Sequence, residues 1–275
     1  MASHAPQPLA LPRRLLGATG MSVSCLGLGT VKIGRNEGVK YPTGFELPDD
    51  QQLRELLSLS RELGINLIDT APAYGSSEER LGQLLSNRQD WVICSKVGEE
   101  FEGGKSFFDF SAAHVRRSIE RSLQRLRTNY LDLVLVHSDG NDEDIILRTD
   151  CFEALTRCRE EGLIRAFGMS TKTVAGGRLA VEKSDVVMVT YHPGATKDGE
   201  VIDLAYARGK GVLIKKALNS GHALSSGADP VKANLQFIFS KPGVNAIIVG
   251  TINPVHLRQN VEAAVAAGAG RWCGQ

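Results

Sequence analysis

Short apolar runs alternate with longer amphipathic stretches along this chain. The runs are rich in Val, Ile and Leu, and each predicts a β-strand: Val23–Leu28, Ile65–Ile68, Trp91–Ser95, Leu131–Val136, Ala166–Met169, Val186–Thr190, Val212–Lys215 and Ala246–Val249. Between them, apolar residues recur at intervals of three and four, which predicts helices such as Asp50–Leu63 and Ala112–Leu126. Ser111 is placed to cap the second of these helices, and Gly64 follows the first.

Strands that are apolar on both faces and alternate with helices indicate a parallel sheet covered on each side. Eight such strands in one chain fit a closed (β/α)8 TIM barrel, with the active site at the C-terminal ends of the strands. An open doubly wound sheet would normally carry a G-x-G-x-x-G turn, and Gly27-Leu-Gly-Thr30 has no third glycine. We therefore predict one α/β domain over residues 1–275, with residues 1–12 as a flexible N-terminal tail.

Composition narrows the class of protein. The 275 residues carry a net charge of +1 with acids and bases interspersed, so nucleic acid and membrane surfaces are not expected partners. The five cysteines are scattered without C-x-x-C pairing, which is typical of reduced intracellular thiols, and Cys151 and Cys158 are expected to pack in the core. No apolar segment is long enough to span a bilayer. We expect a cytoplasmic protein that is a monomer, with weak self-association left open.

Residues that handle protons stand at the ends of three predicted strands. Asp69 follows the second strand, Lys96 the third and His137 the fourth, while Tyr74 lies in the loop after Asp69. Taken singly, Lys96 could extend its amine to solvent and His137 could be a packed residue. In a parallel barrel, however, all C-terminal strand ends meet at one face, so the four side chains are expected to converge.

The chemistry of these four side chains is complementary. An ammonium near the Tyr74 phenol favours the phenolate and is expected to draw its pKa towards the working range. A buried ammonium needs a counter-ion, which Asp69 supplies. His137 can donate a hydrogen bond to a carbonyl oxygen. Such a set suits protonation of an oxygen that is becoming an alkoxide.

The motifs around these residues resemble the aldo-keto reductase family over nearly the whole chain. They are Gly64–Gly82, Cys94-Ser-Lys96, Leu131–His137 and Gly162–Ser170. The resemblance implies that Tyr74 is the general acid, Lys96 its pKa-lowering partner, Asp69 the counter-ion of that lysine, and His137 the group that orients the carbonyl. It also implies a nicotinamide cofactor, NADPH with NADH not excluded, a small carbonyl or alcohol substrate, and no metal.

The same resemblance implies a cofactor cradle across the barrel mouth. The residues that match it by position are Gly29, Thr30, Ser170, Thr171, Lys216, Leu218, Ser220, Gly250, Thr251, Asn253, His256 and Asn260. The first pair would lie beside the nicotinamide ribose, the second at the carboxamide, and Leu218 with Ser220 at the pyrophosphate. The segment from Gly250 to Asn260 would hold an adenosine 2′-phosphate at a helix N-terminus. An ordinary Asn-capped helix start is the alternative interpretation of that segment.

Four departures from the family pattern bear on the cofactor. Thr171 stands where many members have Asn, and Met188 stands where a Gln commonly holds the carboxamide. Lys215-Lys216 replace an aromatic–Ser pair that usually stacks on the nicotinamide, so one of these lysines is a candidate for contact with cofactor phosphate. His256 stands where an Arg often binds the 2′-phosphate, although Arg258 is two residues on.

The loops after the third, fourth and seventh strands are short for the family, which implies an open substrate pocket. Phe101, Phe107, Phe108 and Phe110 are expected either to line that pocket or to pack beneath a loop. Glu99–Glu102 is interpreted as a solvated acidic turn.

Three function classes follow from these observations. The leading hypothesis is an NAD(P)H-dependent oxidoreductase that interconverts aldehydes or ketones, sugars included, and alcohols. The second is a non-catalytic nicotinamide-binding sensor or auxiliary subunit, because fold alone does not decide function. The third is a barrel lyase or isomerase that works without nicotinamide.

Overall fold

The computed structural model describes residues 11–39, 41, 44–218 and 229–268. Eight parallel strands close into a barrel in the spatial order β10, β11, β12, β3, β4, β5, β8, β9. They are β3 (Leu26–Gly29), β4 (Leu67–Asp69), β5 (Val92–Val97), β8 (Leu131–His137), β9 (Ile164–Ser170), β10 (Val186–Thr190), β11 (Gly211–Lys215) and β12 (Ala246–Val249). The predicted closed (β/α)8 barrel is confirmed.

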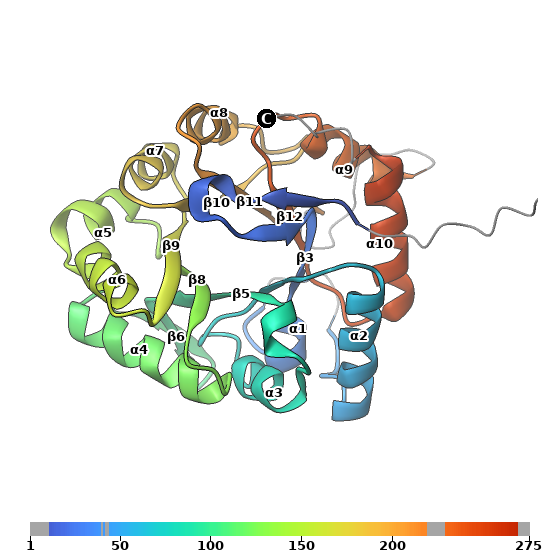
Figure 1. Ribbon diagram of the computed structural model, residues 1–275, viewed down its shortest axis with the longest axis horizontal. Coiled ribbons are helices and arrows are strands. Elements are labelled where there is room, and N and C mark those ends of the chain that lie inside the picture. Colours follow the sequence, from blue (N-terminus) through green and yellow to red (C-terminus); the bar gives the residue numbers. More distant parts are fainter. Residues whose placement is uncertain (1–10, 40, 42–43, 219–228, 269–275) are drawn as a thin grey trace, which may run out of the picture.

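Helices surround the strands on all sides (Figure 1). They are α1 (Val31–Gly34), α2 (Asp50–Glu62), α3 (Ser77–Leu84), α4 (Ala112–Arg125), α5 (Asp142–Arg148), α6 (Cys151–Glu160), α7 (Val174–Lys183), α8 (Gly199–Ala207), α9 (Pro230–Phe239) and α10 (Pro254–Ala266), with short 3₁₀ turns at Gly17–Thr19 and Arg88–Asp90. The two helices predicted from periodicity are therefore confirmed. The Ser111 hydroxyl caps α4 by accepting a hydrogen bond from the His114 amide.

The period of two in the strands separates two apolar layers. One set of side chains fills the barrel interior, and it includes Leu67, Val92, Leu133 and Leu213. The alternate residues pack outwards against the helices and form a second, larger cluster. Cys151 and Cys158 lie in that outer cluster on α6, as expected for packed thiols.

The first predicted strand, Val23–Leu28, is in fact two strands. Ser22–Ser24 (β2) pairs antiparallel with Arg13–Leu15 (β1), and only the part from Leu26 onwards joins the barrel. Leu16, Met21 and Val23 of this β1–β2 hairpin belong to the interior cluster, so the hairpin closes the N-terminal end of the barrel. The C-terminal end of the barrel is therefore the end at which a substrate can enter.

Leu11 and Pro12, which were expected to belong to a flexible N-terminal tail, are part of the packed structure. Leu11 is buried in the outer cluster, and the Pro12 carbonyl accepts a hydrogen bond from the Cys25 amide. Residues 1–10 lie outside the described part of the chain.

A second hairpin follows the third barrel strand. Glu99–Glu102 (β6) pairs antiparallel with Lys105–Phe108 (β7), so the interpretation of the first segment as a solvated acidic turn is wrong. Among the described helices, none is long and apolar enough to cross a membrane.

Candidate active site

An ionisable side chain occupies the last inward position of four barrel strands. Asp69 follows Leu67 on β4, Lys96 follows Cys94 on β5, His137 follows Leu135 on β8, and Lys215 follows Leu213 on β11. The residue two places earlier in each strand fills the barrel interior. All four polar residues line one cavity of about 1580 Å³ at the C-terminal end of the barrel. The predicted convergence of Asp69, Lys96 and His137 is what the structure shows.

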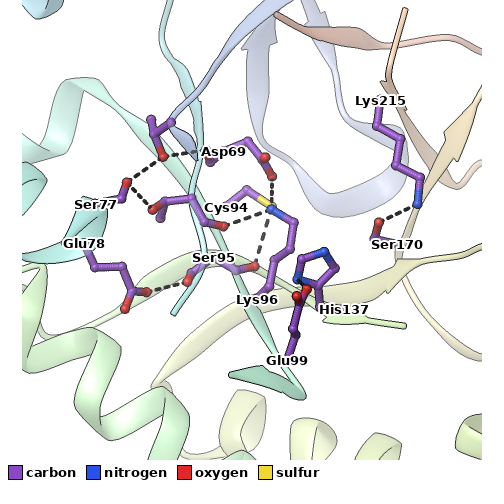
Figure 2. Close-up of polar contacts among 12 residues, drawn as sticks. Asp69, Ser77, Glu78, Cys94, Ser95, Lys96, Glu99, His137, Ser170 and Lys215 are labelled. Carbon is purple, nitrogen blue, oxygen red and sulfur yellow. Dashed lines mark hydrogen bonds and ion pairs between the residues drawn. The ribbon is translucent and has the colours of Figure 1, made fainter. Parts of the chain in front are cut away.

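Lys96 lies at the centre of the predicted catalytic residues, and Figure 2 shows its contact with Asp69. Its Nζ donates hydrogen bonds to Asp69 Oδ1 at 2.5 Å and to the Thr70 carbonyl at 2.9 Å. The same ammonium lies 4.8 Å from the centroid of the Tyr74 ring. The Tyr74 ring meets the His137 ring edge-on, with centroids 6.1 Å apart. The four side chains thus form one contact group.

The electrostatics of Tyr74 differ from the expectation. Burial raises the pKa of the Tyr74 phenol, Lys96 opposes this, and Asp69 adds to the rise, so the net shift is upward. Burial alone would lower the pKa of Lys96, but the Asp69 carboxylate and Tyr74 raise it above its ordinary value. The Lys96 ammonium is paired with Asp69, so it offsets only part of the rise in the pKa of Tyr74. The phenol therefore keeps its proton at neutral pH.

The pairing of Glu99 with His137 was missed in the sequence. Oε2 of Glu99 lies 2.8 Å from Nδ1 of His137. Burial alone would raise the pKa of Glu99, but His137, the Ser106 hydroxyl and Arg35 lower it to about 2. Burial lowers the pKa of His137, and Glu99 opposes that shift. Glu99 is therefore the anion that favours a charged imidazole in this site.

Lys215 is also held inside the cavity. Its Nζ donates hydrogen bonds to Ser170 Oγ at 2.8 Å and to the Thr171 carbonyl at 2.7 Å. Burial lowers the pKa of this lysine to about 7, helped by the charge of Lys216. The signal in the sequence was the inward position at the end of the seventh strand, which Lys215 shares with Asp69, Lys96 and His137.

Most residues expected to form the cofactor cradle line this same cavity. They are Gly29, Ser170, Thr171, Lys216, Leu218, Gly250, Thr251, His256 and Asn260. Met188, one of the departures, lines it as well, whereas Arg258 does not. Which of these residues touch a cofactor stays a prediction.

Two of the expected cradle residues are placed differently, and one lies outside the described residues. Thr30 is fully buried away from the cavity, because its hydroxyl donates to the Asp69 carbonyl at 2.9 Å and accepts from Ser77. The Asn253 side chain caps α10 by accepting from the amides of Val255 and His256, so the helix does have an Asn-capped start, and phosphate binding by this segment stays a prediction. Those two amides are therefore already occupied. Ser220 lies outside the described residues.

The four phenylalanines considered for a pocket wall do not line the cavity. Phe107 and Phe108 are exposed on β7, and Phe108 stacks on Phe110. Phe101 on β6 packs under the Arg35 guanidinium, whose carbon lies 3.4 Å from the ring centroid. Packing under loop residues is thus the correct interpretation for Phe101.

Comparisons with known proteins agree with the fold. A model of the Aldo/keto reductase family matches residues 25–224. The crystal structure of a putative aldo-keto reductase from Pseudomonas aeruginosa superposes with a TM-score of 0.85 at 55% identity, covering 93% of this chain and 95% of that one. An uncharacterized oxidoreductase of Bacillus subtilis is 28% identical, over 92% of this chain and 90% of its own. L-galactose dehydrogenase of Arabidopsis thaliana is 29% identical, over 91% of this chain and 87% of its own.

The family match spans most of the chain, and it includes the strand ends that carry Asp69, Lys96 and His137. The barrel, the converging side chains and these matches lead to one conclusion. The chain belongs to the aldo/keto reductase family of oxidoreductases.

Proposed function

We propose that this protein is an NAD(P)H-dependent oxidoreductase that interconverts aldehydes or ketones, sugars among them, and alcohols, with Tyr74 exchanging the proton. The observation that supports this most directly is the contact group of Tyr74, Lys96, Asp69 and His137 at one end of a large cavity. The L-galactose dehydrogenase relative supports the inclusion of sugars. A bound nicotinamide would supply the hydride to the carbonyl carbon.

The cavity fits a dinucleotide in both size and charge. Its volume of about 1580 Å³ exceeds that of common single-ligand sites, which reach ~1000 Å³, and leaves room for a substrate beside a cofactor. Lys197, Lys216, Lys232 and His256 line it, and such side chains suit phosphate groups. We propose NADPH as the cofactor because this basic lining extends to α10. Glu262 in the same lining works against the extra phosphate, so affinity for NADH must be measured beside it.

The side chains divide the proton chemistry between them. Tyr74 keeps its proton until the substrate oxygen becomes an alkoxide, which is a stronger base than a phenolate and takes the proton. The Lys96 ammonium, 4.8 Å from the ring centroid, then stabilises the phenolate that remains. Asp69 holds Lys96 in place, and His137 contacts the substrate oxygen from the other side of the Tyr74 ring. In the oxidative direction the same groups act in reverse.

A substrate panel tests the proposal. Affinity for NADPH and NADH is measured by fluorescence, and turnover is followed by nicotinamide absorbance with aldehydes, ketones, aldoses and alcohols. Tyr74→Phe should keep cofactor affinity and reduce kcat by about 10²–10⁴-fold, the usual contribution of positioned proton transfer. Tyr206→Phe, on the exposed face of α8, is the matched control and should leave kcat unchanged.

Each negative result of these measurements supports a different alternative. Tight cofactor binding without turnover across the panel supports the non-catalytic sensor or subunit. Absence of cofactor binding supports a lyase or isomerase. Normal turnover by Tyr74→Phe shows that another group supplies the proton.

A further inference from the structure

In the described part of the chain, Lys215 has no carboxylate at ion-pair distance. It extends from β11 towards Ser170 at the cavity wall (Figure 2). Its two hydrogen-bond partners are a hydroxyl and a backbone carbonyl, and both are neutral. A buried ammonium is normally paired with a carboxylate. Among the described residues, no carboxylate accepts a hydrogen bond from Lys215.

The charged residues that act on Lys215 do not provide it with a paired carboxylate. Lys216 and Lys172, which line the same cavity, act on Lys215 as like charges. Asp142 and Asp198 attract it from a distance. The Asp142 carboxylate is engaged by the amides of Lys172 and Thr173, and Asp198 by the amide of Thr190. Asp198 Oδ1 has no hydrogen-bond partner among the described residues, and Lys215 donates to neither acid.

The observed contacts suit an uncharged amine. A neutral –NH₂ group has two hydrogens, and Lys215 has two acceptors at hydrogen-bond distance. With both hydrogens donated, the nitrogen lone pair is left for a ligand in the cavity. The lowered pKa of about 7 agrees with this description.

Lys96 provides an internal contrast. It lines the same cavity, but it contacts the Asp69 carboxylate at 2.5 Å, and its pKa is raised. Near neutral pH, Lys96 therefore stays charged, whereas a large fraction of Lys215 is neutral. Of these two lysines, Lys215 is the one whose neutral form can present a lone pair to the cavity.

We propose that Lys215 is a covalent capture site for aldehydes that carry an anionic group. The Nζ lone pair attacks the carbonyl carbon, a C–N bond forms and the carbonyl π bond opens. The carbonyl oxygen then leaves as water together with the two amine hydrogens, and an imine remains. No oxidant or reductant takes part. This capture does not depend on hydride transfer.

The preference for an anionic aldehyde comes from the surrounding charges. Lys172, Lys197 and Lys216 line the cavity around the amine, and a phosphate or carboxylate group on the aldehyde would meet them. A proton taken from solvent converts the imine to an iminium, whose N–H can still donate to the Thr171 carbonyl. The adduct therefore retains one of the two hydrogen bonds.

The test uses the wild-type protein and pyridoxal 5′-phosphate, an aldehyde with a phosphate group. Imines formed at pH 7 are fixed with borohydride and assigned to residues by peptide mass spectrometry over time. Lys215 should be labelled at least ~10-fold faster than the exposed Lys183, because an amine of pKa near 7 has about 10³ times the neutral fraction of an ordinary lysine. Its labelling rate should level off above pH 7, while that of Lys183 continues to rise.

Variants and a second probe sharpen the result. Lys215→Met and Lys215→Arg should lose the fast phase of labelling, and Lys183→Arg should retain it. Pyridoxal lacks the phosphate but is partly closed to a hemiacetal, so the two aldehydes are compared by the labelling rate of Lys215 relative to that of Lys183. This relative rate should be several-fold lower with pyridoxal. Equal labelling of Lys215 and Lys183 in the wild-type protein overturns the proposal, whether or not the variants fold. Equal relative rates for the two aldehydes overturn the anionic preference.

Discussion

At the scale of single residues, the three basic groups at the barrel strand ends have two kinds of partner. Lys96 contacts the carboxylate of Asp69, His137 contacts that of Glu99, and Lys215 contacts only neutral oxygens. Lys96 is the most deeply buried of the three and still keeps a raised pKa, which shows how strongly the partner affects the protonation state. Lys96 is thus a fixed cation, Lys215 an amine near its titration point, and His137 a group whose charge depends on Glu99.

Glu99→Gln should make His137 harder to protonate. Burial and the charges of Lys96 and Lys215 lower the pKa of His137, and Glu99 is the group that opposes them. Loss of an opposite charge at contact distance lowers a pKa by about one to three units. An NMR titration of the histidine ring should show the midpoint of His137 displaced to lower pH by this amount. The His137-dependent limb of the pH–rate profile should move in the same direction.

Glu102→Gln is the matched control for this substitution, because Glu102 is exposed at the far end of the same strand. It should leave the His137 midpoint in place. An unchanged midpoint in Glu99→Gln would mean that the 2.8 Å contact does not govern the charge of the imidazole.

The residues of the site differ in how far the sequence predicts them. Asp69, Lys96 and His137 are predictable because the period of two and the parallel barrel together determine where a strand-end side chain points. The Glu99–His137 contact joins two separate elements, so no local pattern reports it. Thr30 follows β3 directly, and the chain turns there into α1, which directs its hydroxyl to Ser77 instead of the cavity.

At the scale of elements, Arg35 joins three segments at the rim of the cavity. Its guanidinium donates to the carbonyls of Ala73, Glu37 and Gly38, and it stacks on Phe101 of β6. The loop after β3, the loop that carries Tyr74 and the β6–β7 hairpin are thereby held together. The hairpin in turn presents Glu99 to His137.

Arg35→Met should loosen this rim without unfolding the barrel. The lost hydrogen bonds and ring contact are worth about 1–3 kcal/mol, so local opening should become ~10-fold or more frequent. Hydrogen exchange should accelerate at residues 35–39 and along β6, with no change in the barrel strands.

Arg157→Met, which removes an exposed ion pair with Glu153 on α6, is the control and should leave exchange at the rim unchanged. If Arg35→Met exchanged like the wild-type protein in both segments, the rim would be held by other contacts.

The elements themselves are unequally visible in the sequence. Apolar runs mark the barrel strands because both of their faces are buried. The β6–β7 hairpin contains the charged residues Glu99, Glu100, Glu102 and Lys105. It therefore has no apolar run from which its strands could be predicted. The run Val23–Leu28 has no break in its apolar pattern. Its first residues nevertheless belong to the β1–β2 hairpin and its last residues to the barrel strand β3, and this division is decided by tertiary packing.

At the scale of the whole molecule, the two ends of the barrel have different tasks. The β1–β2 hairpin seals the N-terminal end with apolar side chains, while the C-terminal end buries charged groups around a cavity. Burying a lysine without a counter-ion opposes folding whenever that lysine is protonated in the unfolded chain. Lys215 should therefore reduce global stability at neutral pH.

The pH dependence of unfolding measures this cost. Lys215 titrates near pH 7 in the folded protein, and an unfolded lysine titrates near ~10.4. Between these values the native state binds fewer protons than the unfolded state, so stability rises with pH. Lys215→Met removes this dependence, although it also leaves the partners of the amine without a donor. The free energy of unfolding of the wild-type protein relative to Lys215→Met should rise by about 1.4 kcal/mol per pH unit from ~7 to ~10 and be flat below this range.

Urea unfolding of both proteins at a series of pH values gives this difference directly. The lost hydrogen bonds add a constant to it and do not affect its slope, which is why the slope is the quantity to compare. Lys183→Met, at an exposed position at the end of α7, should run parallel to the wild-type protein throughout. A parallel line for Lys215→Met as well would show that Lys215 titrates like an ordinary lysine. Its amine would then be protonated at neutral pH, and neither the stability cost nor the capture of aldehydes would follow.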